Sequence, residues 1–166
     1  MIRRTFLVLL LYLATNANAQ DIKLSQGIVT GVAGAKTISY KGIRFAQPPT
    51  GEHRWQPPRP LGTSDSRTQA DQFGPACLQS ENQRLKARDM SEDCLNLNVW
   101  TPIEHAEKRP VMVWIHGGAF RGGSNRINGE RFANQGFVFV SLNYRLGPLG
   151  FFAHEALNQR AANFGL

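Results

Sequence analysis

The segment 110–124, PVMVWIHGGAFRGGS, constrains the fold more than any other, because an apolar run leads directly into four glycines. Residues 111–115 (VMVWI) are continuously apolar, as expected of a β-strand that is covered on both faces. A second apolar, β-rich run follows at 137–144 (FVFVSLNY), and residues 128–136 (NGERFANQG) between the two runs predict a short helix that Gly136 ends. Two buried strands joined through a helix predict a parallel pair in an α/β sheet.

The glycine turn itself predicts chemistry, because a backbone without Cβ atoms bends sharply and lets a ligand approach its N–H groups. His116-Gly117-Gly118-Ala119 stands where the first strand is expected to end. Amides that converge at such a point form an oxyanion hole, which stabilises negative charge on a carbonyl oxygen during acyl transfer. An HGGG-type turn of this kind follows the third strand of α/β-hydrolases. The alternative is a purely structural turn, and for His116 a structural hydrogen-bonding role is favoured over that of a base.

Phosphate-binding glycine motifs are excluded by their spacing. The sequence contains no G-x-G-x-x-G, and GVAGAKT (31–37) is not a P-loop, because Thr30 and Ala35 stand where glycines are required.

The part of the chain before the glycine turn is β-rich and then irregular. Residues 22–34 and 36–46 predict short strands separated by glycine turns, in an antiparallel meander. Five prolines within 47–61 and the polar composition of 62–92 predict irregular chain, with a helical turn around ENQRLKARDM. In CLNLNVWTP (94–102) leucine and valine alternate with other residues, which predicts a strand with one buried face.

Two further expectations concern the segments after the second apolar run. LGPLGFF (146–152) predicts a turn-rich loop, and HEALNQRAANFGL (154–166) predicts the beginning of a helix.

The N-terminus has the pattern of a signal peptide over residues 1–19. Arg3 and Arg4 precede the apolar stretch TFLVLLLYLA, and Ala17-Asn18-Ala19 forms an A-x-A cleavage pattern before Gln20. The apolar stretch is short for a bilayer, so we expect cleavage, secretion or a periplasmic location, and no stable membrane insertion afterwards. An uncleaved anchor helix is the alternative.

Export changes the interpretation of the two cysteines, Cys77 and Cys94, which are the only ones in the chain. An even count in an oxidising compartment favours a disulfide, and closing a loop of this size contributes about 3 kcal/mol in the chain-entropy model. Two independent buried thiols are the alternative. Two ligands are too few for a structural zinc site, and no metal is expected.

The positive charge does not by itself indicate nucleic-acid binding. The formal net charge is +7, but the basic residues are scattered singly or in pairs, and no nucleic-acid-binding motif accompanies them. A solvated basic surface is the favoured explanation.

Four segments together resemble the type-B carboxylesterases, the group that includes the cholinesterases and secreted bacterial para-nitrobenzyl esterases. They occur in the family's order at 41–61 (KGIRFAQPPTGEHRWQPPRPL), 91–102 (SEDCLNLNVWTP), 110–120 (PVMVWIHGGAF) and 140–152 (VSLNYRLGPLGFF). The resemblance covers residues 22–166 and implies that 20–166 are part of a type-B carboxylesterase domain. The implied fold is the N-terminal part of an α/β-hydrolase, with small antiparallel strands and the first strands of the central sheet. The implied activity is hydrolysis of small-molecule carboxylic esters without a cofactor.

When the family's residue roles are carried over by position, the resemblance implies an oxyanion hole in the glycine turn. The backbone amides of Gly118 and Ala119 are two donors in this comparison, and Gly117 shapes the turn. Many relatives have a third glycine where Ala119 stands, but alanine keeps the backbone N–H.

The resemblance also implies two structural links. Cys77 and Cys94 match the family's first disulfide, and Arg54 and Glu92 are similar to a buried ion pair that ties the N-terminal segment to the strand around Cys94. If the pair is buried, deleting one partner costs about 3–5 kcal/mol.

The catalytic triad of such an esterase has no counterpart in these residues. None of the serines stands in the G-x-S-x-G pattern of a nucleophile elbow, and Ser124 in GGSN comes nearest. In the family the serine, the acid and the histidine lie beyond the point that corresponds to residue 166, so we expect the isolated chain to be inactive. Two alternatives use the fold without catalysis: a cholinesterase-like adhesion or binding module, and a short exported binding protein that folds alone.

Overall fold

The computed structural model describes residues 20–104, 108–157 and 163–165. The predicted signal peptide, residues 1–19, lies outside the described residues. The strands are β1 (Gln20–Leu24), β2 (Gly27–Ala33), β3 (Thr37–Arg44), β4 (Arg67–Gln69), β5 (Ala76–Cys77), β6 (Met90–Ser91), β7 (Asn96–Pro102), β8 (Val111–Ile115) and β9 (Val138–Leu142). The helical elements are short: η1 (Gly51–His53), η2 (Ala87–Asp89), α1 (Glu130–Ala133), α2 (Gly147–Phe151) and η3 (Glu155–Leu157).

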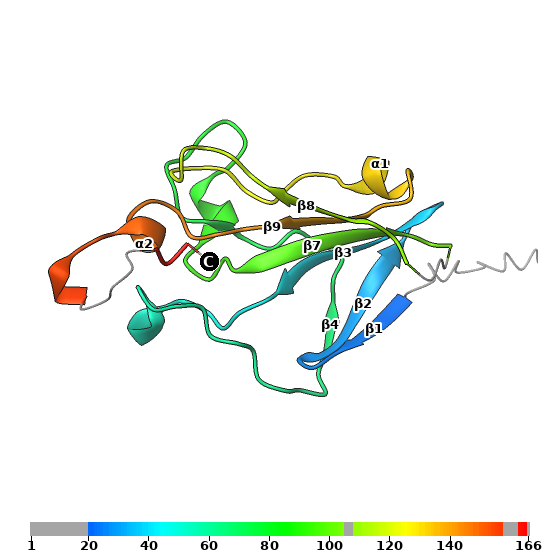
Figure 1. The fold of residues 1–166 in the computed structure, drawn as a ribbon, viewed down its shortest axis with the longest axis horizontal. Coiled ribbons are helices and arrows are strands. Elements are labelled where there is room, and N and C mark those ends of the chain that lie inside the picture. Colours follow the sequence, from blue (N-terminus) through cyan, green and yellow to red (C-terminus); the bar gives the residue numbers. More distant parts are fainter. Residues whose placement is uncertain (1–19, 105–107, 158–162, 166) are drawn as a thin grey trace, which may run out of the picture.

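One mixed sheet organises the described residues, in the order β1-β2-β3-β7-β9-β8, with β4 added beside β2 (Figure 1). The antiparallel meander predicted for the N-terminal strands is confirmed, since β2 pairs antiparallel with both β1 and β3. β3 then pairs with β7, and the register shifts between Tyr40 and Ile43. Buried side chains of β2 and β3 form one apolar cluster with Ala70, which follows β4: Val29, Ile38, Tyr40, Ile43 and Ala70.

The predicted parallel pair is also confirmed. β8 and β9 lie parallel, from Val111 opposite Val138 to Ile115 opposite Leu142. The short helix α1 lies in the connection between them and packs through Phe132, which stacks on Phe139 with ring centroids 4.7 Å apart. Phe139 is fully buried and also contacts Trp100 of β7, at 6.0 Å between centroids.

The expectation that β8 is covered on both faces is wrong for the described residues. β8 is the last strand of the sheet, and Val111, Val113 and Ile115 are 62%, 54% and 59% exposed. The opposite face, with Met112 and Trp114, packs against the cluster around Phe139. The difference has a simple cause: no element within the described residues lies over the valine and isoleucine side chains.

β7 has the predicted period of two, but its more deeply buried face carries asparagines. Asn96, Asn98 and Trp100 are 3%, 0% and 2% exposed, whereas Leu97 and Val99 are only half-buried. Buried polar side chains are tolerated when they are hydrogen-bonded. Both asparagine side chains are hydrogen-bonded, Asn96 to the Pro75 carbonyl oxygen and Asn98 to Ser141 Oγ.

An amide network joins β7 to β9 and to the loop after the glycine turn. Asn98 Nδ2 donates to Ser141 Oγ at 3.0 Å and to the Asn125 carbonyl oxygen at 3.1 Å. Asn125 Nδ2 donates to the Asn96 carbonyl oxygen at 2.9 Å, and the Asn125 amide donates to Asn143 Oδ1 at 2.8 Å. The network fixes the end of the glycine loop to the middle of the sheet.

Two local expectations need correction. Residues 147–151 form α2 rather than a loop, with a proline in the first helical turn, where its missing N–H costs nothing. The expected helix near the C-terminal end is a three-residue 3₁₀ turn, η3, within the described residues, and 158–162 lie outside them.

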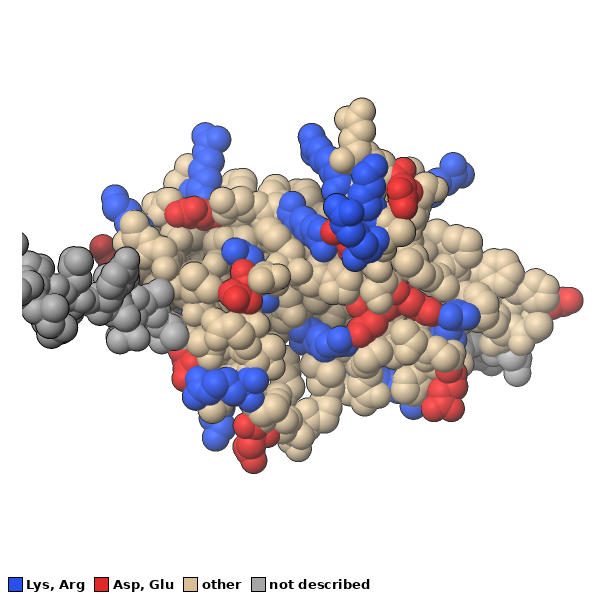
Figure 2. Space-filling model, turned by 180° about the vertical axis from the view of Figure 1, so that it is seen from behind, with Lys and Arg blue, Asp and Glu red and all other residues tan. Residues whose placement is uncertain are grey.

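The surface is mixed in charge on the face shown in Figure 2, where Asp and Glu side chains lie among the Lys and Arg side chains. No helix in the described ranges has the length and apolar character that a membrane span requires.

Candidate active site

The turn after β8 has an unusual backbone. Gly118, Ala119 and Phe120 have φ values of +124°, +53° and +59°, so three consecutive residues lie in the left-handed region. The Gly118 carbonyl closes the turn by accepting from the amides of Arg121 and Gly122 at 3.0 and 3.2 Å. Alanine and phenylalanine at positive φ are strained, and such strain is found mainly at functional sites.

The glycines of the turn differ in whether the surrounding atoms leave room for a Cβ. A Cβ on Gly118 would lie 1.9 Å from the Gly122 carbonyl oxygen, and one on Gly123 would lie 2.1 Å from His116 Nδ1. A Cβ on Gly117 would meet no atom within 4 Å. The turn therefore needs glycine at Gly118 and Gly123, whereas the shaping role expected of Gly117 has no steric basis in the described residues.

The two amides carried over as oxyanion donors have no partner within the described part of the chain. Within the described ranges, the N–H groups of Gly118 and Ala119 donate no hydrogen bond. Both residues are exposed and line a cavity of about 410 Å³. These donors are thus available to a bound molecule.

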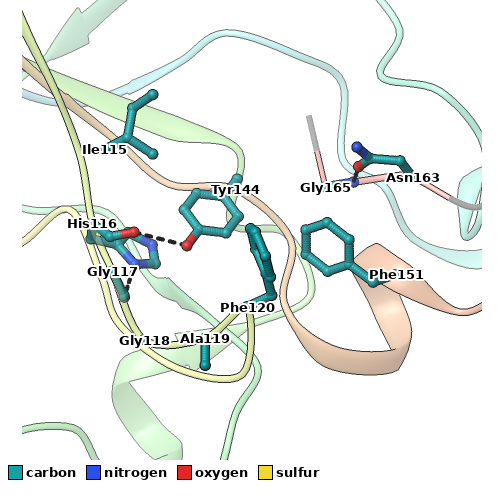
Figure 3. A pocket seen from close by; sticks show the side chains of 10 residues that line it. All are labelled: Ile115, His116, Gly117, Gly118, Ala119, Phe120, Tyr144, Phe151, Asn163 and Gly165. Atoms are coloured by element: carbon teal, nitrogen blue, oxygen red, sulfur yellow. Dashed lines mark hydrogen bonds between the residues drawn. The ribbon is translucent and has the colours of Figure 1, made fainter.

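The cavity wall is mostly aromatic and apolar (Figure 3). Its larger side chains come from the end of β8, the turn itself, the segment from Tyr144 to α2, and the C-terminal segment: Ile115, His116, Phe120, Tyr144, Phe151 and Asn163. Phe120 lies between Tyr144 and Phe151, with ring centroids 6.3 and 4.8 Å away. Sequence reasoning did not assign Phe120, Tyr144 or Phe151 to the site, although the left-handed turn at Phe120 is what brings that ring into the cavity.

His116 is built into the scaffold of the turn. It is 4% exposed, stacks on Tyr144 at 4.4 Å between centroids, and its Nδ1 lies 3.0 Å from the Gly117 carbonyl oxygen. Tyr144 Oη donates to the His116 carbonyl oxygen at 2.8 Å. Burial lowers the pKa of the His116 imidazole, so the neutral ring with its proton on Nδ1 suits this site. The geometry supports the structural role over that of a base.

The structure contains both structural links that the resemblance implies. Cys77 and Cys94 form a disulfide that closes a separation of 17 positions. Arg54 and Glu92 form a bidentate ion pair, with Nη2 2.6 Å from Oε2, and the hydrogen bonds that Arg54 donates to Glu92 raise the pKa of Arg54. The pair is not buried as a unit: the side chain of Arg54 is 42% exposed and that of Glu92 is 14% exposed. A partly exposed pair contributes less stability than a buried one.

A second arginine near Glu92 is far more deeply buried. Arg145 is 2% exposed, and its Nη2 donates to the Gln56 carbonyl oxygen at 2.9 Å. Among the described residues, its Nε and Nη1 have no hydrogen-bond partner. Burial lowers the pKa of Arg145, and the negative charge of Glu92 acts in the opposite direction.

The sequence profile described as Carboxylesterase family matches residues 18–166. The chain belongs to the carboxylesterase family. Within this family, Fumonisin B1 esterase of Sphingopyxis macrogoltabida is 42% identical over 161 residues, which cover 89% of this chain and 29% of that protein. Para-nitrobenzyl esterase of Bacillus subtilis (strain 168) is 38% identical over 156 residues, which cover 89% of this chain and 32% of that protein.

Solved carboxylesterase structures show the same fold. The structure of a thermophylic PNB esterase superposes with a TM-score of 0.80 at 35% identity, over 89% of this chain and 32% of that one. The carboxylesterase chain described here therefore has part of the α/β-hydrolase fold and spans about a third of the length of these relatives.

Proposed function

We propose that this carboxylesterase chain supplies the oxyanion hole of a serine esterase that hydrolyses small-molecule carboxylic esters. The observation that carries the proposal is the pair of amides at Gly118 and Ala119, which donate to no described residue and lie in a left-handed turn that borders a cavity. The family relationship supports ester hydrolysis as the reaction class.

The turn can contribute at the step where charge develops. A serine oxygen attacks the ester carbonyl carbon, the electron pair of the C=O bond moves onto oxygen, and the alkoxy group leaves with a proton. Two amides aimed at that oxygen stabilise the intermediate, and losing one donor costs about 10²–10³ in rate. Because the strained turn already holds its shape, the donors need no reorganisation when the charge appears.

The cavity wall supports a preference for uncharged groups next to the reacting carbonyl. Phe120, Tyr144 and Phe151 contribute aromatic surface, and no side chain that lines this cavity in the described residues is charged at neutral pH if His116 is neutral. An apolar wall also strengthens the hydrogen bonds to the oxyanion, because the local dielectric constant is low.

The nucleophile has to come from elsewhere in the family domain. Residues 1–166 contain no G-x-S-x-G. We therefore propose that the 166-residue chain alone does not turn over esters, whereas a domain that joins it to a family nucleophile elbow does.

A chimera tests both parts of the proposal. Residues 20–166 replace the matching segment of the Bacillus subtilis para-nitrobenzyl esterase, with which they share 38% identity. We expect the chimera to hydrolyse a para-nitrophenyl ester and to be blocked by a serine-directed phosphonate, and the 166-residue chain to do neither. A folded chimera that binds the phosphonate covalently but shows no turnover would contradict the oxyanion role. Phosphonate-sensitive turnover by the 166-residue chain would contradict the need for a separate elbow.

We also propose that the protein is exported and cleaved before Gln20. The disulfide between Cys77 and Cys94 suits an oxidising compartment and supports the proposal. N-terminal sequencing of the protein recovered outside the cytoplasm should begin at Gln20, and a retained Met1 would contradict cleavage.

A further inference from the structure

The loop that contains the two amides is connected to the disulfide by one side chain, Gln79. Gln79 lies two positions after Cys77, in the segment closed by the disulfide. Its Oε1 accepts from the Gly123 amide at 2.8 Å, and its Nε2 donates to the Gly123 carbonyl oxygen at 2.7 Å. The same Nε2 also donates to the Cys77 carbonyl oxygen at 3.0 Å.

This arrangement uses the glutamine side chain almost completely. A carboxamide has two N–H donors and one acceptor oxygen, and here both donors and the oxygen are engaged. Two of the three hydrogen bonds go to the backbone of one residue, so Gly123 is held in orientation as well as in position. Glutamate lacks the donors, and asparagine is shorter by one methylene group.

Gly123 in turn is in close contact with the beginning of the turn. A Cβ on Gly123 would lie 2.1 Å from His116 Nδ1 and 2.5 Å from the Gly117 carbonyl oxygen, so the Gly123 backbone packs directly against both residues. The Gly118 carbonyl is held by the amides of Arg121 and Gly122, the latter next to Gly123 in the chain. Holding Gly123 therefore restricts the whole segment from His116 to Gly123.

We propose that Gln79 is a positioning residue of the glycine turn, which aligns the Gly118 and Ala119 amides and couples their alignment to the Cys77–Cys94 disulfide. The functional part of this inference rests on the proposed oxyanion role. Its structural part, the restraint of the turn, does not.

Amide hydrogen exchange in the full 166-residue chain tests the restraint without any activity. In Gln79→Ala we expect the Gly123 amide to exchange about ten-fold faster, as for the loss of a hydrogen bond worth about 1.4 kcal/mol. Gln79→Glu keeps an acceptor for the Gly123 amide, but its carboxylate loses both donors and faces the Gly123 and Cys77 carbonyl oxygens, so we expect a smaller acceleration than in Gln79→Ala at neutral pH. Protection should recover at pH values where the carboxyl group is protonated and can donate again. A general loss of stability would not show this recovery.

Gln47→Ala is the matched control, because Gln47 also donates through Nε2 to a carbonyl, that of Pro60, at 2.9 Å and away from the turn. It should leave the exchange of Gly123 unchanged. Reduction of the disulfide should accelerate the exchange of Gly123 in the wild type more than in Gln79→Ala. Unchanged exchange of Gly123 in Gln79→Ala, or equal effects of the Gln47 and Gln79 variants, would overturn the restraint.

The same variants in the chimera test the alignment. Gln79→Ala should lower kcat about ten-fold or more with little change in KM. Misaligned donors stabilise the transition state less, whereas substrate binding is largely unchanged. If the Gly123 amide exchanges faster in Gln79→Ala but the chimera with this substitution keeps the wild-type kcat, the positioning role is wrong. An inactive chimera with the expected exchange pattern would instead contradict only the oxyanion proposal.

Discussion

At the scale of single residues, Gly118 and Gly117 look alike in sequence but differ in what the structure demands of them. Gly118→Ala places a Cβ against the Gly122 carbonyl oxygen at a φ of +124°. We expect it to lower the free energy of unfolding of the chain by about 1–3 kcal/mol. In the chimera it should reduce kcat by about 10²–10³ through the displaced donor.

Gly117→Ala is the control for this prediction. Its Cβ meets no atom within 4 Å, and its φ lies outside the left-handed region, so urea denaturation should show stability equal to or slightly above that of the wild type. Equal losses in both variants would show that the steric assignment is wrong.

The buried imidazole of His116 predicts a pH dependence of stability. Burial lowers its pKa in the folded protein below the ordinary value of 6.5. The unfolded chain therefore binds a proton more readily, so His116 contributes stability above pH 6.5 that is lost as the pH falls below that value toward the folded pKa. His116→Phe keeps a ring against Tyr144 and should flatten the stability profile in this range.

Urea denaturation at several pH values between 5 and 8 measures this effect. Tyr144→Phe is the control: it removes the hydrogen bond to the His116 carbonyl but leaves the imidazole in place. It should lower stability without removing the acid-side slope. A slope that survives in His116→Phe would assign the pH dependence to another group.

At the scale of elements, β8 combines a packed face with an exposed one. An edge strand with exposed apolar side chains promotes association with other chains. Replacing Val111 and Val113, which are 62% and 54% exposed, by lysine should reduce self-association of the 166-residue chain in size-exclusion chromatography with light scattering, at little cost in stability.

Two comparisons isolate the cause. Thr63→Lys/Gln83→Lys adds the same charge at exposed polar positions and should leave association unchanged. Met112→Lys puts a charge on the packed face of β8 and should destabilise the chain. Equal solubility gains from both double variants would attribute the effect to net charge alone.

The elements that sequence predicted well are those set by local pattern. The meander of β1 to β3 follows from alternation and glycine turns, and the β8–α1–β9 unit follows from apolar runs and a helix stop at Gly136. The buried asparagine face of β7 could not be predicted from periodicity, because its burial depends on partners at Asn125, Ser141 and Asn143, which lie far away in sequence.

The residues of the candidate site also divide into those that local sequence pattern predicts and those that it does not. The glycines and the disulfide cysteines could be recognised from motif and composition. The left-handed Phe120 and the hydrogen bonds of Gln79 could not, because each depends on how a loop folds against another segment.

At the scale of the whole molecule, two arginines lie near Glu92, and they differ in how deeply their charged groups are buried. Arg54 is paired with Glu92 and partly exposed, whereas Arg145 is 2% exposed and its Nε and Nη1 find no acceptor in the part of the chain that the structure describes. Nε carries one N–H and Nη1 carries two, so most of the guanidinium donors are unsatisfied. A buried charge without a full set of partners opposes folding.

Arg145→Met should therefore stabilise the 166-residue chain. Methionine fills a similar volume without a charge, and removal of the desolvation cost outweighs the lost hydrogen bond to the Gln56 carbonyl oxygen, for a net gain of about 1–4 kcal/mol. Arg54→Met is the matched comparison and should destabilise the chain, because it leaves the largely buried carboxylate of Glu92 without its bidentate partner. Thermal and urea unfolding of both variants measure whether each substitution raises or lowers the free energy of unfolding. A loss of stability in Arg145→Met as large as that in Arg54→Met would mean that the Arg145 guanidinium contributes favourable interactions in the folded chain that exceed its burial cost.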